Sequence, residues 1–258
     1  MDSAAAPREE AGVASCLHAA DRITLIYAAL IALVAVVVAA RIPAWWIVLS
    51  ISAVVWVGVI ALALAHQRFG GATLGFVHDW YVAVLVFPAF KELQFVISPL
   101  HRGVDYDAWF IAADRWLFGT DPTRWLSRFA HPLATEVLLV AYTSFYWLFL
   151  LAGIEVYARA DRRAFRWMFF TCVYGFYLVF VGYLFLPAVG PRLTLHDYAT
   201  IQTEPRGLWL TPYLRRFVDA GDSIPLGAPL EAARAAAQRD LFPSGHTMMS
   251  LVLIWCCF

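Results

Sequence analysis

Two uncharged apolar runs near the N-terminus, residues 23–40 and 44–65, decide what this chain can fold into. Each is long enough to cross the ~30 Å hydrocarbon core of a bilayer as one helix. Only Arg41, Ile42 and Pro43 separate them, which predicts a tight turn and an antiparallel helical hairpin. The chain is 62% hydrophobic, whereas a soluble domain is about half apolar. These features predict an integral membrane protein, and a formal net charge of zero gives no reason to expect nucleic acid as a partner.

Further apolar runs extend the pattern. Residues 133–154 and 167–186 are each long enough to span, whereas residues 80–100 form a poorer span that Pro88 interrupts. The run that begins at Pro243 is cut short at Phe258. We therefore predict an all-α, polytopic membrane helix bundle of about six transmembrane helices, the last incomplete. Residues 105–118 are amphipathic and residues 122–129 are short, so both are predicted to be interfacial helices.

The same patterns divide the chain into three parts. Residues 1–22 are predicted to form a loose polar tail, and residues 23–100 the N-terminal transmembrane helices. Residues 101–258 are predicted to form the functional membrane domain, with a long loop at 188–242. Lys91 leaves two interpretations open: its side chain reaches the membrane surface, or it lends a cation to a polar pocket between helices.

The orientation follows from arginines. Arg159, Arg162, Arg163 and Arg166 cluster in what we predict to be a short loop, and such clusters mark the cytoplasmic side. The next span then exits on the outer face and carries the 188–242 loop with it. We predict a multi-pass protein of the plasma (cytoplasmic) membrane with its site on the outer face.

Two short segments at opposite ends of that loop have the chemistry of an anion site. Two prolines and a glycine at 187–191 stop the preceding helix and deliver Arg192 to the membrane surface. Pro243 is predicted to start the next helix, with Ser244, Gly245 and His246 in its first turn. Free N–H groups and the positive end of the helix dipole favour an anion there. A guanidinium grips two phosphate oxygens, and an imidazole can move a proton.

Residues 243–246, Pro-Ser-Gly-His, resemble the second signature of the type 2 phosphatidic acid phosphatase superfamily, membrane enzymes that act on phospholipid phosphates. The first signature of that superfamily is matched in part. Its arginine would be Arg192, but proline precedes it as Pro191, and Phe185 stands where a lysine belongs. This Gly-Pro-Arg form, with the segment 114–119 and Pro122, resembles the inositol phosphorylceramide synthase branch.

The resemblance implies roles for the site residues. Arg192, Ser244 and Gly245 would bind phosphate, and His246 would be the catalytic acid that protonates the leaving alkoxide. It implies a membrane lipid phosphatase or phosphotransferase acting on a phospholipid or lipid-linked phosphate through a phosphohistidine-type mechanism. The residues require no metal and no other cofactor, and the membrane and its lipid phosphate are the expected partners.

The third signature, which supplies the nucleophilic histidine, does not occur before Phe258, so we expect the sequence to be C-terminally truncated. His196 and Asp197 are the one pair that could substitute, but adjacent residues are poorly placed to form an orienting hydrogen bond. The alternative function is therefore a catalytically inactive membrane protein that at most binds lipid phosphate.

Overall fold

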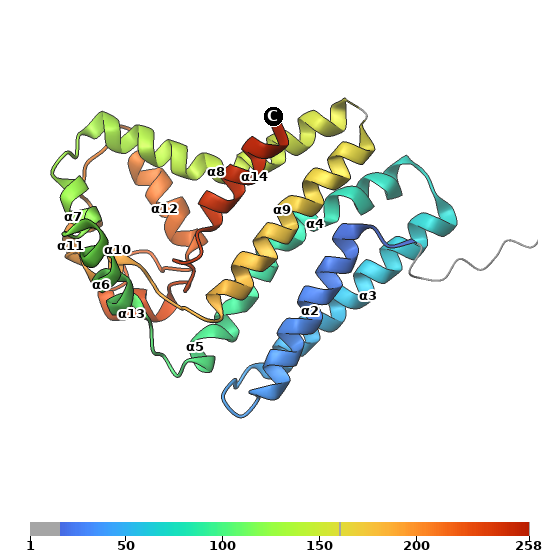
Figure 1. The fold of residues 1–258 in the computed structure, drawn as a ribbon, viewed down its shortest axis with the longest axis horizontal. Helices are drawn as coiled ribbons and strands as arrows, with labels where there is room; N and C mark the ends of the chain where they lie inside the picture. The colour runs from blue at the N-terminus through green and yellow to red at the C-terminus, as the bar shows by residue number, and fades with distance from the viewer. Residues whose placement is uncertain (1–15, 160, 258) are drawn as a thin grey trace, which may run out of the picture.

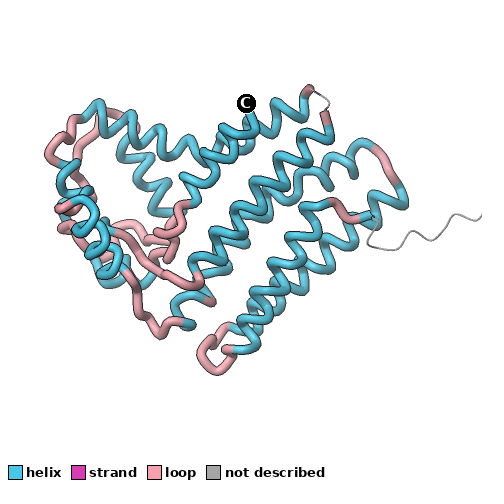
Figure 2. The backbone as a smooth tube through the Cα atoms, in the orientation of Figure 1, coloured by secondary structure: helices cyan, strands magenta, loops and turns pink. Residues whose placement is uncertain are grey.

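The computed structural model describes residues 16–159 and 161–257, and every regular element in those ranges is a helix (Figures 1 and 2). Five of the described helices are long and apolar enough to cross a membrane. They are α2 (Ala19–Val37), α3 (Trp45–Phe69), α4 (Ala72–Glu92, continued by short helices to Leu100), α8 (Pro132–Ala158) and α9 (Arg162–Tyr183). The predicted membrane helix bundle is thereby confirmed, and the protein is a multi-pass membrane protein.

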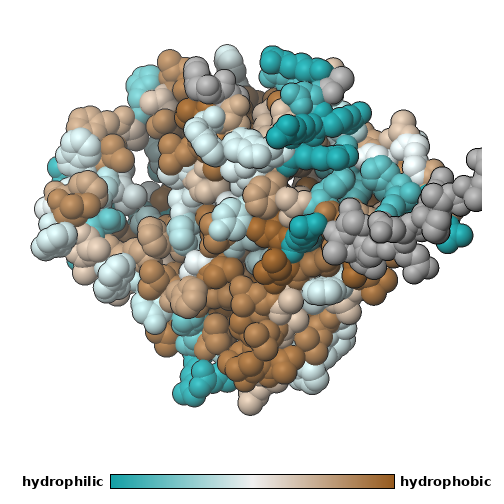
Figure 3. Space-filling model, turned by 45° about the vertical axis from the view of Figure 1, so that its right-hand side comes forward, coloured by the Kyte–Doolittle hydropathy of each residue, from teal (hydrophilic) through white to brown (hydrophobic). Residues whose placement is uncertain are grey.

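The outer surface of the bundle is apolar. Large aliphatic side chains face outward along three different spans, where Ile26 is 66%, Val54 72% and Val84 75% exposed. Figure 3 shows a broad apolar area, with hydrophilic residues gathered toward the top of that view. A continuous apolar surface of this kind is unfavourable in water and is satisfied by lipid. The buried core between α2, α4 and α9 includes Ile31, Phe165 and Phe169.

Several helix boundaries differ from the predicted ones; α4, for example, begins at Ala72 and not at residue 80. Helix α2 begins at Ala19, so residues 19–22 of the predicted loose tail are helical; residues 1–15 lie outside the described residues. Helix α9 begins at Arg162 and not at residue 167, because Asp161 caps it by accepting the N–H of Ala164 at 2.8 Å. Most of the arginine cluster is therefore helical. Arg166 pairs with the buried Asp79 of α4 at 2.8 Å, so it also holds two spans together.

Helix α4 passes through Pro88 and continues to Glu92, so the proline does not interrupt the span. Membrane helices tolerate proline because neighbouring groups satisfy the freed backbone positions. Three residues after Pro88, Lys91 donates to Ser223 Oγ at 2.7 Å and to the carbonyl of Gly221. These contacts favour the second interpretation of Lys91, a cation that serves polar groups between helices.

The segment 188–242 carries four short helices: α10 (Pro191–Thr194), α11 (Tyr198–Ile201), α12 (Thr211–Gly221) and α13 (Leu230–Ala236). With α6 (Asp107–Phe118) and α7 (Pro122–Ser127) they form the cluster on the left of Figure 1. Arg234 donates to the carbonyl of Leu193 at 2.7 Å, and Arg239 pairs with Asp105 at 3.2 Å. The long predicted loop is thus a packed substructure at one end of the bundle.

The carboxylate of Glu136 fixes one side of this substructure. Glu136 is buried near the start of α8 and accepts the backbone N–H groups of four consecutive residues at 2.6–3.1 Å, Leu208, Trp209, Leu210 and Thr211. These N–H groups belong to the first turn of α12 and the residues before it, which have no intrahelical acceptor. The side chain therefore joins the start of α12 to a membrane span.

The carboxylate of Asp107 fixes the other side. Asp107 is the first residue of α6 and is 7% exposed. It accepts the N–H of Val189 at 3.1 Å and the N–H of Gly190 at 2.7 Å. Gly190 has φ of 92°, a conformation that favours glycine, and α10 starts at the next residue. Asp107 thus holds the turn that places Arg192.

We predict that Asp107→Ala lowers the free energy of unfolding by about 2–3 kcal/mol, because two buried N–H groups lose a charged acceptor. Unfolding in detergent micelles measures the effect. Asp114→Ala is the matched control, since Asp114 is an exposed aspartate on the same helix; it should change stability by less than about 0.5 kcal/mol. Equal stability of the two variants would contradict this assignment.

Candidate active site

A cavity of about 490 Å³ lies where the 188–242 substructure meets α8, α9 and α14 (Gly245–Cys257). We call it the loop cavity. All four residues singled out in the sequence, Arg192, Ser244, Gly245 and His246, line it. The structure therefore brings together two segments about fifty positions apart in the chain. Its further polar lining comes from Tyr142, Tyr183, Glu204, Arg215, Asp222 and Asp240.

Arg192 lies in α10, directly after the turn that Asp107 holds. Its Nη1 atom is 2.6 Å from Oδ1 of Asp219 in α12, as a close ion pair. The arginine side chain remains 28% exposed, so part of the guanidinium is open to the loop cavity. A phosphate that enters can therefore reach the cation, in competition with Asp219.

The helix that carries His246 starts later than predicted. Helix α14 begins at Gly245 and not at Pro243, because Ser244 acts as its N-cap and its Oγ accepts the N–H of Thr247 at 3.2 Å. Pro243 instead packs against Gly182 of α9, where a Cβ atom would come within 2.7 Å of the proline ring. The proline of the Pro-Ser-Gly-His segment thus packs closely against α9, and the serine caps the start of α14.

The imidazole of His246 is held between aromatic rings of α8. Its ring stacks on Tyr142 at 4.1 Å and on Phe145 at 4.0 Å between centroids. Its Nε2 atom is buried and has no hydrogen-bond partner among the described residues. An unpaired buried polar atom is unfavourable, so this nitrogen has an unused hydrogen-bonding capacity. The residue that carries it lines the loop cavity.

Sequence reasoning missed a second cation, Arg215 of α12. Its guanidinium donates to the carbonyls of Gln202 and Pro205, and the residue lines the loop cavity together with the Gly-Pro-Arg turn. No sequence motif marks this residue, and the helix that carries it, α12, was not predicted from the sequence. Arg215 gives the loop cavity a second cation besides Arg192. Phe185, which stands where the first signature has a lysine, is an apolar side chain that is 68% exposed.

Sequence reasoning also missed two acidic groups. Burial, reinforced by the charge of Asp240, raises the pKa of Asp222 from an ordinary value of 3.8 to about 7. Burial likewise raises the pKa of Asp240. Arg192 and Lys91 oppose the shift at Asp222, but only in part. Near neutral pH the loop cavity therefore carries less negative charge than its composition indicates, which favours an anion.

The C-terminal part of the chain matches a known family. The family model described as the PAP2 superfamily matches residues 108–258, which is more than half of the chain. The chain belongs to the PAP2 superfamily. No curated protein and no solved structure gives a match. The PAP2 region contains every residue that lines the loop cavity, whereas α2, α3 and α4 precede it.

The raised pKa of Asp222 gives a pH prediction for this PAP2 protein. In the folded chain the carboxyl keeps its proton up to about pH 7, whereas in the unfolded chain it loses the proton near pH 3.8. Folding therefore takes up a proton between these values, and the stabilising contribution of this group is lost as the pH rises toward 7.

We predict that Asp222→Asn, which imitates the protonated form, flattens the fall in melting temperature between about pH 4 and 7, the window between the unfolded and folded pKa values of this group. The control is Asp114→Asn, on an exposed aspartate, which should keep the wild-type pH profile. An Asp222→Asn profile as steep as that of the wild type would show that another group is responsible.

Proposed function

We propose that the loop cavity binds the phosphate group of a phospholipid or lipid-linked phosphate and that the protein transfers or hydrolyses it. The observation that carries the proposal is that Arg192 and His246 line one cavity at the end of the membrane helices, and that Nε2 of His246 has no partner among the described residues. Membership of the PAP2 superfamily and the apolar outer surface support a lipid as the molecule that bears the phosphate.

In this proposal Arg192 and Arg215 bind non-bridging phosphate oxygens, and the first turn of α14 adds backbone N–H groups near Gly245. Ser244 contributes chiefly by capping that turn. The phosphate dianion favours the imidazolium form of His246. His246 then gives its Nε2 proton to the bridging oxygen of the leaving alcohol, as the nucleophile bonds to phosphorus and the P–O bond to that alcohol breaks.

The described lining of the loop cavity holds one histidine, His246, so it supplies the acid but not a histidine nucleophile. His196 is not a substitute in this proposal, because its Nε2 bonds Thr123 Oγ1 at 2.9 Å and the residue does not line the loop cavity. The same observation favours a second candidate function, binding of lipid phosphate without turnover. The resemblance of the Gly-Pro-Arg segment to the inositol phosphorylceramide synthase branch favours transfer to a polyol acceptor over simple hydrolysis.

We predict that His246→Ala lowers the turnover of phosphatidate in mixed micelles by about 10²–10⁴-fold, because the leaving alkoxide loses its acid. Arg192→Ala should weaken phosphate binding as well as turnover. Two controls are matched by residue type. His196→Ala removes a histidine that does not line the loop cavity, and Arg128→Ala removes an exposed arginine. Both controls should retain wild-type turnover.

Other outcomes of these assays are equally informative. Unchanged turnover in His246→Ala would reject the catalytic role of His246. Phosphate binding that depends on Arg192, without turnover in the wild-type chain, would support the binding-only alternative. Lost turnover in His196→Ala alone would make His196 the nucleophile.

A separate prediction concerns the acceptor. We expect a free polyol such as inositol to compete with water as the acceptor of the phosphoryl group. A phosphorylated polyol should then accumulate, and less free phosphate should be released. Product analysis by ³¹P NMR with and without inositol measures the partition. Release of free phosphate that inositol does not alter would assign simple phosphatase action.

A further inference from the structure

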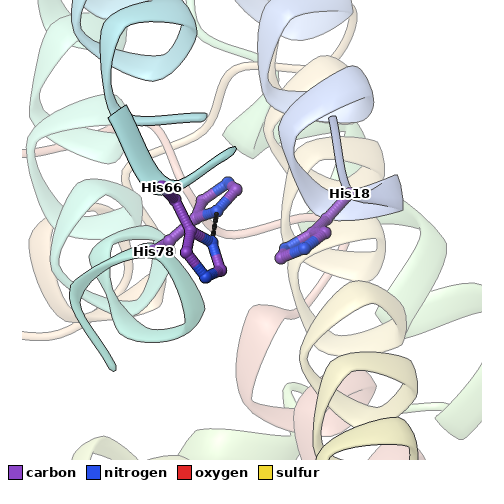
Figure 4. Close-up of side chains that lie close together, drawn as sticks. All are labelled: His18, His66 and His78. Atoms are coloured by element: carbon purple, nitrogen blue, oxygen red, sulfur yellow. Dashed lines mark hydrogen bonds between the residues drawn. The ribbon is translucent and has the colours of Figure 1, made fainter. Parts of the chain in front are cut away.

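Three histidines meet at the opposite end of the bundle from the loop cavity (Figure 4). They come from three elements: His18 is the N-cap of α2, His66 lies near the end of α3, and His78 lies in the first half of α4. One ring nitrogen of each lies within 4.8 Å of those of the other two. The cluster lies outside the PAP2 region, so the proposed phosphate chemistry does not explain it.

Hydrogen bonding determines which nitrogen of His78 is available. Its Nε2 atom is 2.9 Å from Oδ2 of Asp21, and both side chains are 1% exposed. The carboxylate can only accept, so Nε2 carries the proton and Nδ1 presents a lone pair. That Nδ1 faces Nδ1 of His66 at 2.9 Å, as the dashed line in Figure 4 shows. Two imidazole nitrogens therefore point at one shared position.

Asp21 is held in place by two further hydrogen bonds. Tyr81 donates its hydroxyl to Oδ1 at 2.7 Å, and the backbone N–H of His18 donates to Oδ2 at 2.6 Å. A carboxylate that fixes the tautomer and orientation of a histidine is the usual second partner of a metal-binding imidazole. Asp21 provides this support for His78 and also anchors the backbone of His18.

The spacing suits a small transition-metal ion. Nitrogens bound to one Zn²⁺ at about 2.0–2.1 Å in a tetrahedral arrangement lie roughly 3.3 Å apart, so the His66–His78 pair needs to open by only a few tenths of an ångström. The ring of His18 now stacks on His78 at 4.2 Å and has to turn about its side-chain torsions to direct a nitrogen inward. An adjacent cavity of about 210 Å³, lined by His18, Asp21 and His78, leaves room for a water at the fourth position.

We propose that His18, His66 and His78 bind one divalent transition-metal ion, with Zn²⁺ as the preferred species, and that Asp21 positions His78 for it. Imidazole is a favoured ligand of Zn²⁺, and three protein ligands with an open fourth position form a common zinc geometry. When the ion binds, the proton on Nδ1 of His66 moves to Nε2 of the same ring, and the metal takes its place between the two Nδ1 atoms. The ion ties the start of α2 to the α3–α4 hairpin.

The test uses the full chain in detergent, purified with an affinity tag that contains no histidine and stripped with a chelator. Titration with Co²⁺ is followed by its visible absorption, Zn²⁺ is then added in competition, and metal content is measured by mass spectrometry. We expect one ion per chain, tetrahedral Co²⁺ bands that Zn²⁺ abolishes, and a melting temperature that Zn²⁺ raises.

Variants assign the ligands. His66→Ala and His78→Ala should each lower Zn²⁺ affinity at least tenfold, and Asp21→Asn by about 10–100-fold, because it acts through His78. His131→Ala is the control, since His131 is exposed at the start of α8, and it should bind Zn²⁺ as the wild type does. His66 is less buried than His78, so its variant remains informative if His78→Ala does not fold.

Two results would overturn the proposal. One is a wild-type chain that binds less than stoichiometric Zn²⁺ at ion concentrations well above that of the protein. The other is folded His66→Ala protein that keeps the tetrahedral Co²⁺ bands and the Zn²⁺-dependent rise in melting temperature. Either would leave the cluster as a hydrogen-bonded histidine pair without a metal.

Discussion

Non-helical backbone next to a membrane has N–H groups that need acceptors, and two buried carboxylates supply them here. Asp107 accepts from the turn at 189–190, and Glu136 accepts from the four residues that lead into α12. Without these acceptors the substructure 188–242 would expose unpaired donors in a region with little water. The positions of Arg192 and of Arg215 both follow from these two anchors, because each arginine lies within a few residues of one of them.

The loop cavity combines cations with acids in a way that tunes it for an anion. Arg192 is engaged by Asp219 but not enclosed by it, so an incoming phosphate has to compete for the guanidinium. Asp222 and Asp240 have raised pKa values, which lessens their repulsion of an anion near neutral pH. His246 differs from all of these, since aromatic stacking fixes its ring while its Nε2 atom has no partner among the described residues.

The two ends of the bundle carry different chemistry. The PAP2 region forms the loop cavity at one end, and α2, α3 and α4 contribute the histidine cluster at the other. Helix α9 connects them: it starts beside Asp79, which Arg166 binds, and its Gly182 packs against Pro243 near the loop cavity. A metal at the histidine cluster would hold the N-terminal helices without contact with the loop cavity.

The sequence by itself determined the membrane bundle, because runs of about twenty uncharged apolar residues have few other stable structures. It also identified Arg192 and the segment 243–246, because prolines, a glycine and a signature stand at those places. Only the tertiary structure decided that Ser244 caps α14, that Arg215 and Asp222 line the same cavity, and that Asp107 orients the turn. It alone brought together His18, His66 and His78, since these contacts join residues up to sixty positions apart and local patterns carry no information on such pairs.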